Sequence, residues 1–317
     1  MSSFAIEVER LEKVFRGRDR SPVRAVDELT FAVGEGSIFG LLGPNGAGKT
    51  TTLKVLTTLT RPTAGRARVA GFDVVASPLD VRRRIAVVIQ EHAADLLLTV
   101  RDNLESFGRF HGLSGPTLRA RIGRVIEQFG LMEYTARKVQ DLSGGFRRRV
   151  QVAKVLMVET PILFLDEFST GMDPILKRAV MSLLREESRR GRTIVLTTQV
   201  LTEAEELCDD ILIINHGRQV ARGDLHTLKL LSEGVYELTL TFDELPAGLD
   251  AELVQLNPLR QDVTGTTLQV ALKEDEQRVL ALVSRLAARG RVRRVELGGA
   301  TLEDVFVELT SGERKEQ

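Results

Sequence analysis

The residues best suited to chemistry form one short glycine-rich segment that ends in a lysine. Its pattern is G-x-x-x-x-G-K-[ST], with Lys49 and Thr50 in the last two positions. The glycines let backbone N–H groups converge on phosphate oxygens, and the positive end of the next helix adds to that attraction. Lys49 is expected to reach the β- and γ-phosphates and the Thr50 hydroxyl to ligate Mg²⁺. The residues predicted to bind a nucleotide here are Gly43, Pro44, Asn45, Gly46, Ala47, Gly48, Lys49, Thr50 and Thr51.

Two adjacent carboxylates, Asp166 and Glu167, follow a short apolar run that starts at Ile162. A buried strand that ends in a carboxylate places Asp166 where it can hold the metal, directly or through water. Glu167 lies one residue beyond the strand and is free to polarise a water for attack on the γ-phosphate. Taken alone, this pattern favours solvated acids after an ordinary strand. Together with the phosphate loop, it favours a metal and water site.

A second glycine-containing segment opens an amphipathic stretch at residues 142–145. Ser143 can cap that helix, while Gly144 and Gly145 leave its first N–H groups bare, which makes a second anion-binding helix end. The chain therefore has two phosphate-binding helix starts and one phosphate loop. Two such ends can serve one nucleotide if two subunits pack head to tail.

Together with residues 169–173, these segments resemble the ATP-binding subunit of an ABC transporter. The resemblance covers about residues 4–227 and rests on several ordered motifs. It implies that two ATPase subunits hold two ATP molecules between them. Each ATP is then bound by the phosphate loop of one protomer and by Ser143 and Gly145 of the other.

The resemblance assigns two further roles and leaves two positions that depart from the family. It implies that Gln90 touches Mg²⁺ and senses the membrane subunit, and that Phe15 stacks on adenine, with a buried core side chain as the alternative for Phe15. Phe146 replaces the family's usual Gln, and Gln199 replaces its usual His. A Gln amide can donate a hydrogen bond to the γ-phosphate but cannot titrate. We therefore expect Glu167 to be the base and Gln199 a neutral γ-phosphate sensor.

Finer details resemble the daunorubicin-type drug-resistance exporters within that family, in residues 88–91, 143–149, 170–174 and 300–306. The implied activity is ATP hydrolysis that powers efflux of a drug, a lipid-like molecule or another small molecule. The implied partners are separate ABC-2-type membrane subunits and a second ATPase subunit, identical or paired, at the cytoplasmic face of the membrane. An importer ATPase, a non-transport ABC ATPase and an inert ATP-binding switch are the alternatives.

The elements that must position these residues can be predicted from the apolar pattern. Short apolar runs alternate with helical stretches, which is typical of an α/β fold. With the resemblance, the expected fold is a P-loop NTPase core with an antiparallel β subdomain and an inserted helical subdomain, followed by a small α+β domain. The ATPase domain is predicted at 4–230, its helical subdomain at about 99–158, the small domain at 234–310 and a frayed tail at 311–317.

Composition excludes several other classes of function. The 317 residues carry 44 Lys plus Arg and 44 Asp plus Glu, a formal net charge of zero that argues against nucleic acid as a partner. The arginine clusters at 82–84 and 147–149 are therefore interpreted as solvated helix faces, offset by acids such as Asp80 and Glu159. Cys208 is the single cysteine, which excludes a disulfide framework. No apolar run is long enough to span a bilayer, so any membrane role is assigned to another chain.

Overall fold

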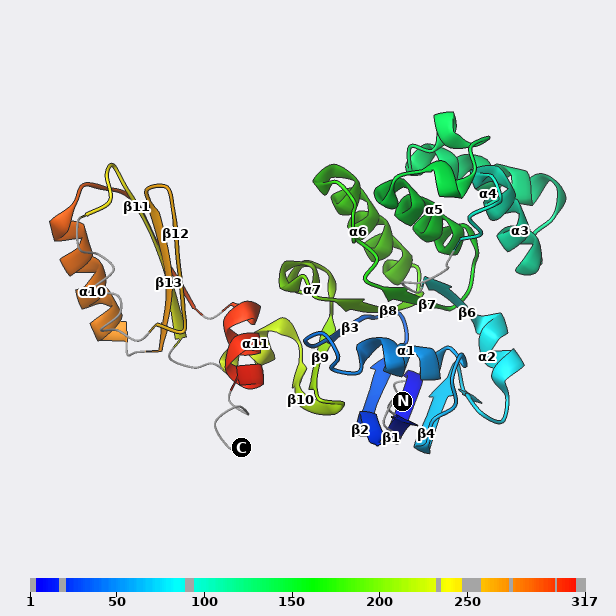
Figure 1. The fold of residues 1–317 in the computed structure, drawn as a ribbon, viewed down its shortest axis with the longest axis horizontal. Helices are drawn as coiled ribbons and strands as arrows, with labels where there is room; N and C mark the ends of the chain where they lie inside the picture. The colour runs from blue at the N-terminus through cyan, green and yellow to red at the C-terminus, as the bar shows by residue number, and fades with distance from the viewer. Residues whose placement is uncertain are drawn as a thin grey trace. The chain divides into compact units, whose positions relative to one another are not determined.

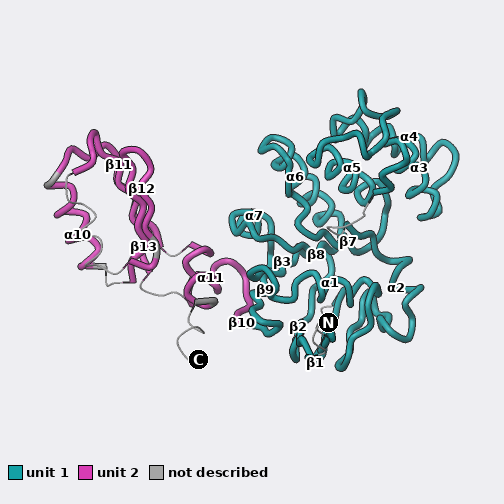
Figure 2. The backbone as a smooth tube through the Cα atoms, in the orientation of Figure 1, with its two compact units in different colours: residues 1–219 teal, residues 220–317 magenta. Residues whose placement is uncertain are grey.

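The computed structural model describes residues 4–16, 21–88, 94–231, 235–246, 258–273, 276–299 and 301–311. Gln90 and residues 312–317 of the tail expected to fray lie outside the described residues. The chain divides into two compact units, Met1–Gln219 and Val220–Gln317 (Figures 1 and 2). Among the described residues, no helix combines the length and apolar character that crossing a membrane requires.

A six-stranded sheet has the strand order β10-β9-β3-β8-β7-β6, and its strands from β9 to β6 form the centre of the first unit (Figure 1). Every residue of β3, β7 and β8 is buried, as expected for parallel strands that are covered on both faces. Parallel pairing brings the carboxyl ends of these three strands to one edge. The strands are β3 (Ile38–Leu42), β6 (Ile85–Val88), β7 (Ile162–Asp166), β8 (Thr193–Thr198), β9 (Asp210–Asn215) and β10 (Arg218–Gly223).

An antiparallel sheet of order β2-β1-β4-β5 packs on this core, which confirms the expected β subdomain. One apolar cluster joins the two sheets and helix α1 (Lys49–Leu56), and in it the rings of Phe31 and Phe39 stack with their centroids 5.4 Å apart. The strand before the phosphate loop is thus fixed on both sides. The strands are β1 (Phe4–Arg16), β2 (Pro22–Gly34), β4 (Ala64–Val69) and β5 (Phe72–Asp73).

Helices α3, α4 and α5 contact one another and lie together in Figure 1. Side-chain caps begin α3 and α5: the Thr99 side chain accepts a hydrogen bond from the Asp102 N–H, and the Ser143 side chain accepts one from the Phe146 N–H. At the start of α6, the Asp173 side chain likewise accepts from the Leu176 N–H. The helices of this unit beyond α1 are α2 (Pro78–Arg84), α3 (Val100–Phe110), α4 (Gly115–Gln128), α5 (Gly144–Met157), α6 (Pro174–Arg189) and α7 (Leu201–Leu207).

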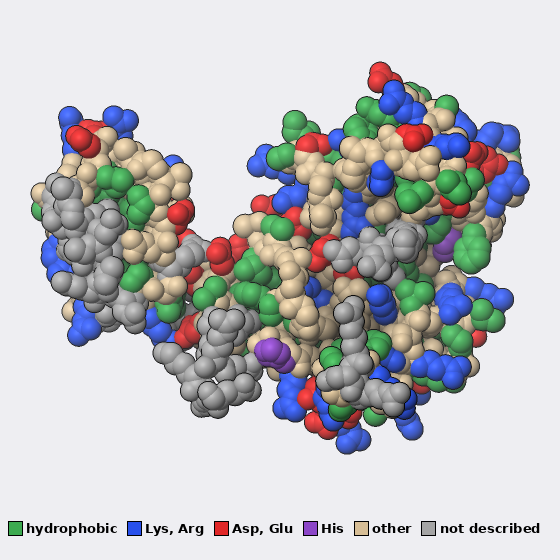
Figure 3. All heavy atoms as spheres, in the orientation of Figure 1, with side chains coloured by type: hydrophobic (Ala, Val, Ile, Leu, Met, Phe, Trp, Pro, Cys, Tyr) green, Lys and Arg blue, Asp and Glu red, His purple; other side chains and the backbone are tan. Residues whose placement is uncertain are grey.

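The two arginine clusters differ from each other in burial. Arg83 is exposed and pairs with Asp80 at 3.6 Å, as expected for a solvated face. The same expectation is wrong for Arg148, which is 6% exposed because it points from α5 toward the end of β7. Glu159 pairs with Arg121 and not with this cluster. On the visible face of the first unit, Figure 3 shows basic and acidic side chains interspersed.

The second unit is built on an antiparallel sheet of order β12-β13-β11-β14. Leu238, Leu240 and Phe242 alternate along one face of β11 and form a core with Leu282 and Leu286 of α10. The hairpin between β12 and β13 turns at Gly265, whose φ is +61°. The elements are α8 (Leu225–Leu230), β11 (Val235–Phe242), β12 (Arg260–Thr264), β13 (Thr267–Lys273), α10 (Glu276–Arg289), β14 (Val292–Gly299) and α11 (Leu302–Ser311).

Lys154 lies half-buried on α5, with its Nζ 4.9 Å from the ring centroid of Phe107. Burial lowers its pKa from 10.5 to about 8, while the negative charge of Asp95 opposes that shift. Between these two pKa values the unfolded chain binds more protons than the folded one, so the free energy of unfolding rises with pH there. Below a pH of about 8, the folded chain carries the positive charge of Lys154 in its partly buried position. We therefore expect Lys154→Met to raise the midpoint of thermal unfolding at pH 7 by about 2–4 °C, and the gain to shrink toward pH 10.

Differential scanning calorimetry across this pH range measures the effect. Lys138→Met is the matched control, because Lys138 is exposed and its substitution removes the same charge. This control should leave the unfolding midpoint at pH 7 close to that of the wild type. A gain for Lys154→Met that stays constant from pH 7 to pH 10 contradicts the assignment.

Candidate functional site

The glycine-rich loop after β3 is shaped by two close backbone approaches. A Cβ on Gly43 would lie 2.3 Å from the Ile214 carbonyl oxygen, and one on Gly48 would lie 2.3 Å from the Ala25 carbonyl oxygen. Gly46 and Gly48 also have φ values of +82° and +106°, which side chains disfavour. Helix α1 begins directly after Gly48, so its first N–H groups face the hollow of this loop.

Lys49 is buried within this loop. Its Nζ donates to the carbonyl oxygens of Gly43 at 2.7 Å and of Pro44 at 3.0 Å. Burial lowers the pKa of Lys49, and the carboxylates of Glu167 and Asp166 oppose that shift. The ammonium group is therefore held over the loop by two carbonyls, beside the acid that ends β7 and the acid that follows it.

Asp166 is a buried carboxylate at the end of β7 that accepts hydrogen bonds from two hydroxyls. Thr50 Oγ1 donates to it, with distances of 3.2 and 3.4 Å to its two oxygens, and Thr197 Oγ1 donates from the neighbouring strand β8. Thr50 and Asp166 thus bring a hydroxyl and a carboxylate together from two elements. Within the described part of the chain, no group of three or more His, Cys, Asp or Glu side chains has the arrangement of a metal site.

Glu167 has its backbone in the left-handed region, with φ at +49°. Such a conformation costs a non-glycine residue about 1–2 kcal/mol, so neighbouring contacts must hold it. The Glu167 N–H donates to the Thr197 carbonyl oxygen at 3.0 Å. Gln199 Nε2 donates to Glu167 Oε1 at 2.6 Å, so the loop after β8 fixes the carboxylate itself.

These groups meet around a cavity of about 350 Å³. It joins most of the predicted phosphate loop to Glu167 and Gln199, and Asp166 adjoins it through Thr50. Ala25 of β2 also lines it; sequence reasoning missed this residue, since an alanine in a strand carries no chemical signal. The lining residues are Ala25, Asn45, Gly46, Ala47, Gly48, Lys49, Thr50, Thr51, Glu167 and Gln199.

Several predicted site residues lie elsewhere among the described residues. Phe15 is 43% exposed, which excludes the buried core alternative, and Lys13 Nζ lies 4.9 Å from its ring centroid. It is not among the residues that line the cavity, and neither are Ser143, Gly144 and Gly145. The last three open α5, where a Cβ on Gly145 would lie 2.3 Å from the carbonyl oxygen of Gly171. Within one chain, the start of α5 therefore does not complete the cavity.

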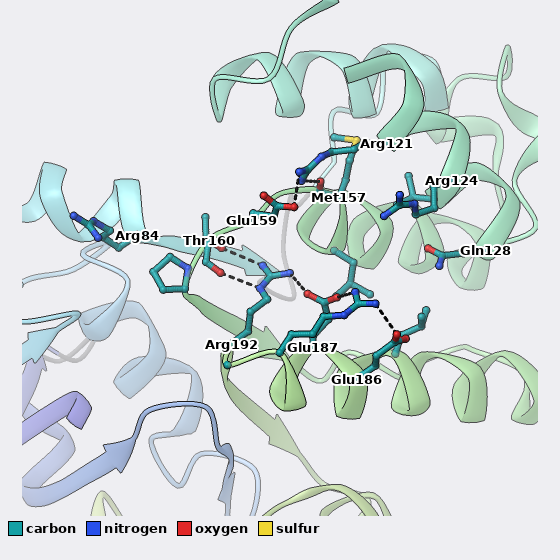
Figure 4. Close-up of a pocket in the computed structure, with 16 residues that line it drawn as sticks. Arg84, Arg121, Arg124, Gln128, Met157, Glu159, Thr160, Glu186, Glu187 and Arg192 are labelled. Carbon is teal, nitrogen blue, oxygen red and sulfur yellow. Dashed lines mark hydrogen bonds and ion pairs between the residues drawn. The ribbon is translucent and has the colours of Figure 1, made fainter. Parts of the chain in front are cut away.

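A larger cavity of about 860 Å³ lies at the opposite, amino-terminal ends of β7 and β8 (Figure 4). Arg192, 8% exposed, donates to the Thr160 carbonyl oxygen at 2.9 Å and pairs with Glu187 at 2.7 Å. Arg121 pairs with Glu159 across the same cavity. Figure 4 shows two separate sets of contacts at this cavity: Arg121 of α4 points toward Glu159, and Arg192, just before β8, points toward Thr160 and toward Glu187 of α6.

Comparisons with known proteins agree with this geometry. The family model described as ABC transporter matches residues 26–170, which include the phosphate loop, the start of α5 and the two carboxylates. The daunorubicin/doxorubicin resistance ATP-binding protein of Streptomyces peucetius is 39% identical, over 96% of this chain and 92% of that protein. The Nod factor export ATP-binding protein I of Ralstonia nicotianae is 38% identical, over 92% and 90%. A solved ATP-binding subunit of an ABC transporter superposes with a TM-score of 0.66 at 28% identity, covering 72% of this chain and 93% of its own.

Proposed function

The chain belongs to the ABC transporter family of ATP-binding proteins and is an ATPase, and we propose that it powers export through separate membrane subunits. The observation that carries the proposal is the cavity shared by Lys49, Thr50, Glu167 and Gln199. It joins the loop proposed to bind the phosphates to the carboxylate proposed as the general base. Two relatives that match along most of this chain carry names for drug resistance and for export.

The nucleotide phosphates are proposed to lie in the hollow of the loop. Bare N–H groups at the start of α1 and the ammonium group of Lys49 supply the attraction. Phe15 is proposed to stack on adenine: it is exposed, and it pairs in the β1–β2 ladder with Val23, two residues from Ala25 of the cavity wall.

Thr50 and Asp166 fit a Mg²⁺ ion that accompanies the phosphates. Their hydroxyl and carboxylate oxygens are the ligands this hard cation prefers, and it usually takes few protein ligands beside waters and phosphate oxygens. Bound there, Mg²⁺ would neutralise charge on the β- and γ-phosphates. Gln90 is proposed as a further ligand and lies outside the described residues.

Glu167 is proposed to act on the attacking water. The carboxylate accepts a proton as the water oxygen bonds to the γ-phosphorus, and the bond from that phosphorus to the β–γ bridging oxygen breaks to release ADP. Gln199 donates a hydrogen bond to Glu167 Oε1 and has no titratable group. Of these two side chains, only the Glu167 carboxylate can therefore accept the proton of the attacking water.

A second subunit is proposed to complete each site. Ser143 and its two following glycines lie outside the cavity of their own chain, and their helix start is free to supply N–H groups to ATP on a partner. ATP then joins two ATPase subunits, which are identical or paired. Hydrolysis separates them and moves ABC-2-type membrane subunits, to which this chain binds at the cytoplasmic face.

Co-expression with a candidate ABC-2-type membrane protein tests this function. Inverted membrane vesicles that contain both proteins should accumulate daunorubicin with ATP, and vesicles with the Glu167→Gln variant should not. Import in place of export would deplete the same vesicles. A chain that fails to purify with the membrane protein and shows no ATP-dependent transport contradicts the proposal.

Gln199 bears on a second candidate, an ATP-binding switch without turnover, because it replaces a titratable side chain. We expect Gln199→Ala to lower the kcat of ATP hydrolysis about 10- to 100-fold, the factor that follows from losing one hydrogen bond to a charged group. Gln199→His keeps an N–H donor and should retain most of the wild-type rate. Steady-state phosphate release measures both, and a Gln199→Ala variant with wild-type kcat contradicts this role.

A further inference from the structure

Arg148 is a buried arginine whose guanidinium group meets three consecutive backbone carbonyls. Its Nη2 donates to the carbonyl oxygens of Asp166 and Glu167, and its Nε donates to that of Phe168 at 3.2 Å. The remaining nitrogen, Nη1, donates to Gln151 Oε1 at 2.7 Å on the same helix. Every nitrogen of the side chain is therefore used, and three of the four acceptors belong to the segment that carries the proposed base.

The carbonyls converge because the chain turns sharply at Glu167, whose φ is +49°. On its other side, the N–H of Glu167 donates to Thr197 of β8. The backbone of Glu167 is thus held between β8 and Arg148, while its carboxylate is left to face Gln199 and the cavity. A rigid fork of several N–H groups suits this task, since one guanidinium spans neighbouring acceptors that a single ammonium cannot.

The same helix contacts the rest of this segment. Gly145 lies against the carbonyl of Gly171, and Arg149 pairs with Asp173 at 2.7 Å. Helix α5 therefore contacts the segment 166–173 at both ends of that segment. Its first turn, at Ser143, is the part proposed to touch ATP on the partner subunit.

From these contacts we propose that Arg148 is a positioning residue, which ties the orientation of Glu167 to the placement of α5. Movement of α5 as ATP binds its first turn shifts the guanidinium group and the three carbonyls with it. ATP held by one subunit thereby sets the geometry of the base in the other. The inference rests on the proposed function, in which Glu167 acts on the attacking water.

Arg192 provides a matched control for a purely structural role. It is also a buried arginine that donates to a backbone carbonyl, that of Thr160, and it lies at the opposite ends of the same strands. A loss of stability that follows from removing any buried arginine should appear equally in Arg148→Met and Arg192→Met. A loss of orientation at Glu167 should appear only in the first.

The test measures kcat, the Kd for ATP in EDTA, the unfolding midpoint and ATP-dependent dimer formation in the full chain. We expect Arg148→Met to lower kcat about 100-fold, the scale of general base catalysis. The Kd for ATP should change less than about threefold, because the phosphate loop is untouched. The ATP-dependent dimer should persist on size-exclusion chromatography. Arg148→Lys should fall between this variant and the wild type, and Arg192→Met should keep the wild-type kcat.

Two outcomes overturn the inference. One is a wild-type kcat in Arg148→Met, or in Arg148→Lys if the first variant does not fold. The other is an equal loss of kcat in Arg192→Met at an equal fall in unfolding midpoint. Either result would leave hydrolysis by the wild type intact, whereas a wild-type chain that does not hydrolyse ATP contradicts the proposed function itself.

Discussion

Glu167→Gln is expected to lower the kcat of ATP hydrolysis by about 10²- to 10³-fold while ATP binding remains. The amide has the shape of the carboxylate and can still accept the hydrogen bond from Gln199 Nε2, but it cannot take the proton of the attacking water. The loop residues proposed to hold the phosphates are unchanged. Phosphate release and ATP binding, measured on the same purified protein, separate the two effects.

The variant should also accumulate as an ATP-bound dimer, because hydrolysis is the step proposed to separate the subunits. Glu133→Gln is the matched control, since Glu133 is exposed and lies in the helical region away from the cavity. It should behave as the wild type in every assay. A Glu167→Gln protein that turns over at the wild-type rate would place the base on another residue.

Lys49→Ala is expected to raise the Kd for ATP about 100-fold or more. The ammonium group is already held over the loop by the Gly43 and Pro44 carbonyls, so little reorganisation is needed for it to reach a phosphate. Its removal takes away a charge-assisted hydrogen bond and leaves those two carbonyls without a donor. Titration calorimetry with ATP and Mg²⁺ measures the loss directly.

Thermal unfolding gives a second measure of the same loss. Saturating ATP should raise the unfolding midpoint of the wild type and leave that of Lys49→Ala nearly unchanged. Lys54→Ala, a substitution in the last turn of the same helix, should keep the shift. Wild-type affinity in Lys49→Ala contradicts the placement of the phosphates on this loop.

Much of the fold could be predicted because its central strands are buried on both faces. Such strands appear in the sequence as continuous apolar runs, and the run from Ile162 to Leu165 became β7 with Asp166 added at its end. The helical stretches between 99 and 158 became α3, α4 and α5, with Ser143 as the N-cap of the last. Local patterns sufficed here because burial and capping leave local signals.

Other features depend on contacts between distant segments. Three consecutive arginines have the composition of a solvated face, and nothing near Arg148 in sequence indicates that carbonyls of the segment after β7 will surround it. Ala25 lines the cavity only because β2 passes against Gly48. The hydrogen bond between Gln199 and Glu167 likewise requires that β7 and β8 be neighbours, an order the apolar pattern does not specify.

We propose that ATP bound at the Lys49 loop is hydrolysed with Glu167 as the base. A single-turnover experiment on the purified full chain tests it most directly, with radiolabelled ATP loaded in EDTA and Mg²⁺ then added. The wild type is expected to convert its bound ATP to ADP and phosphate, and Glu167→Gln is expected to return the ATP intact. Intact ATP recovered from the folded wild type after Mg²⁺ addition would exclude hydrolysis at this site and identify the chain as a switch that binds ATP without hydrolysing it.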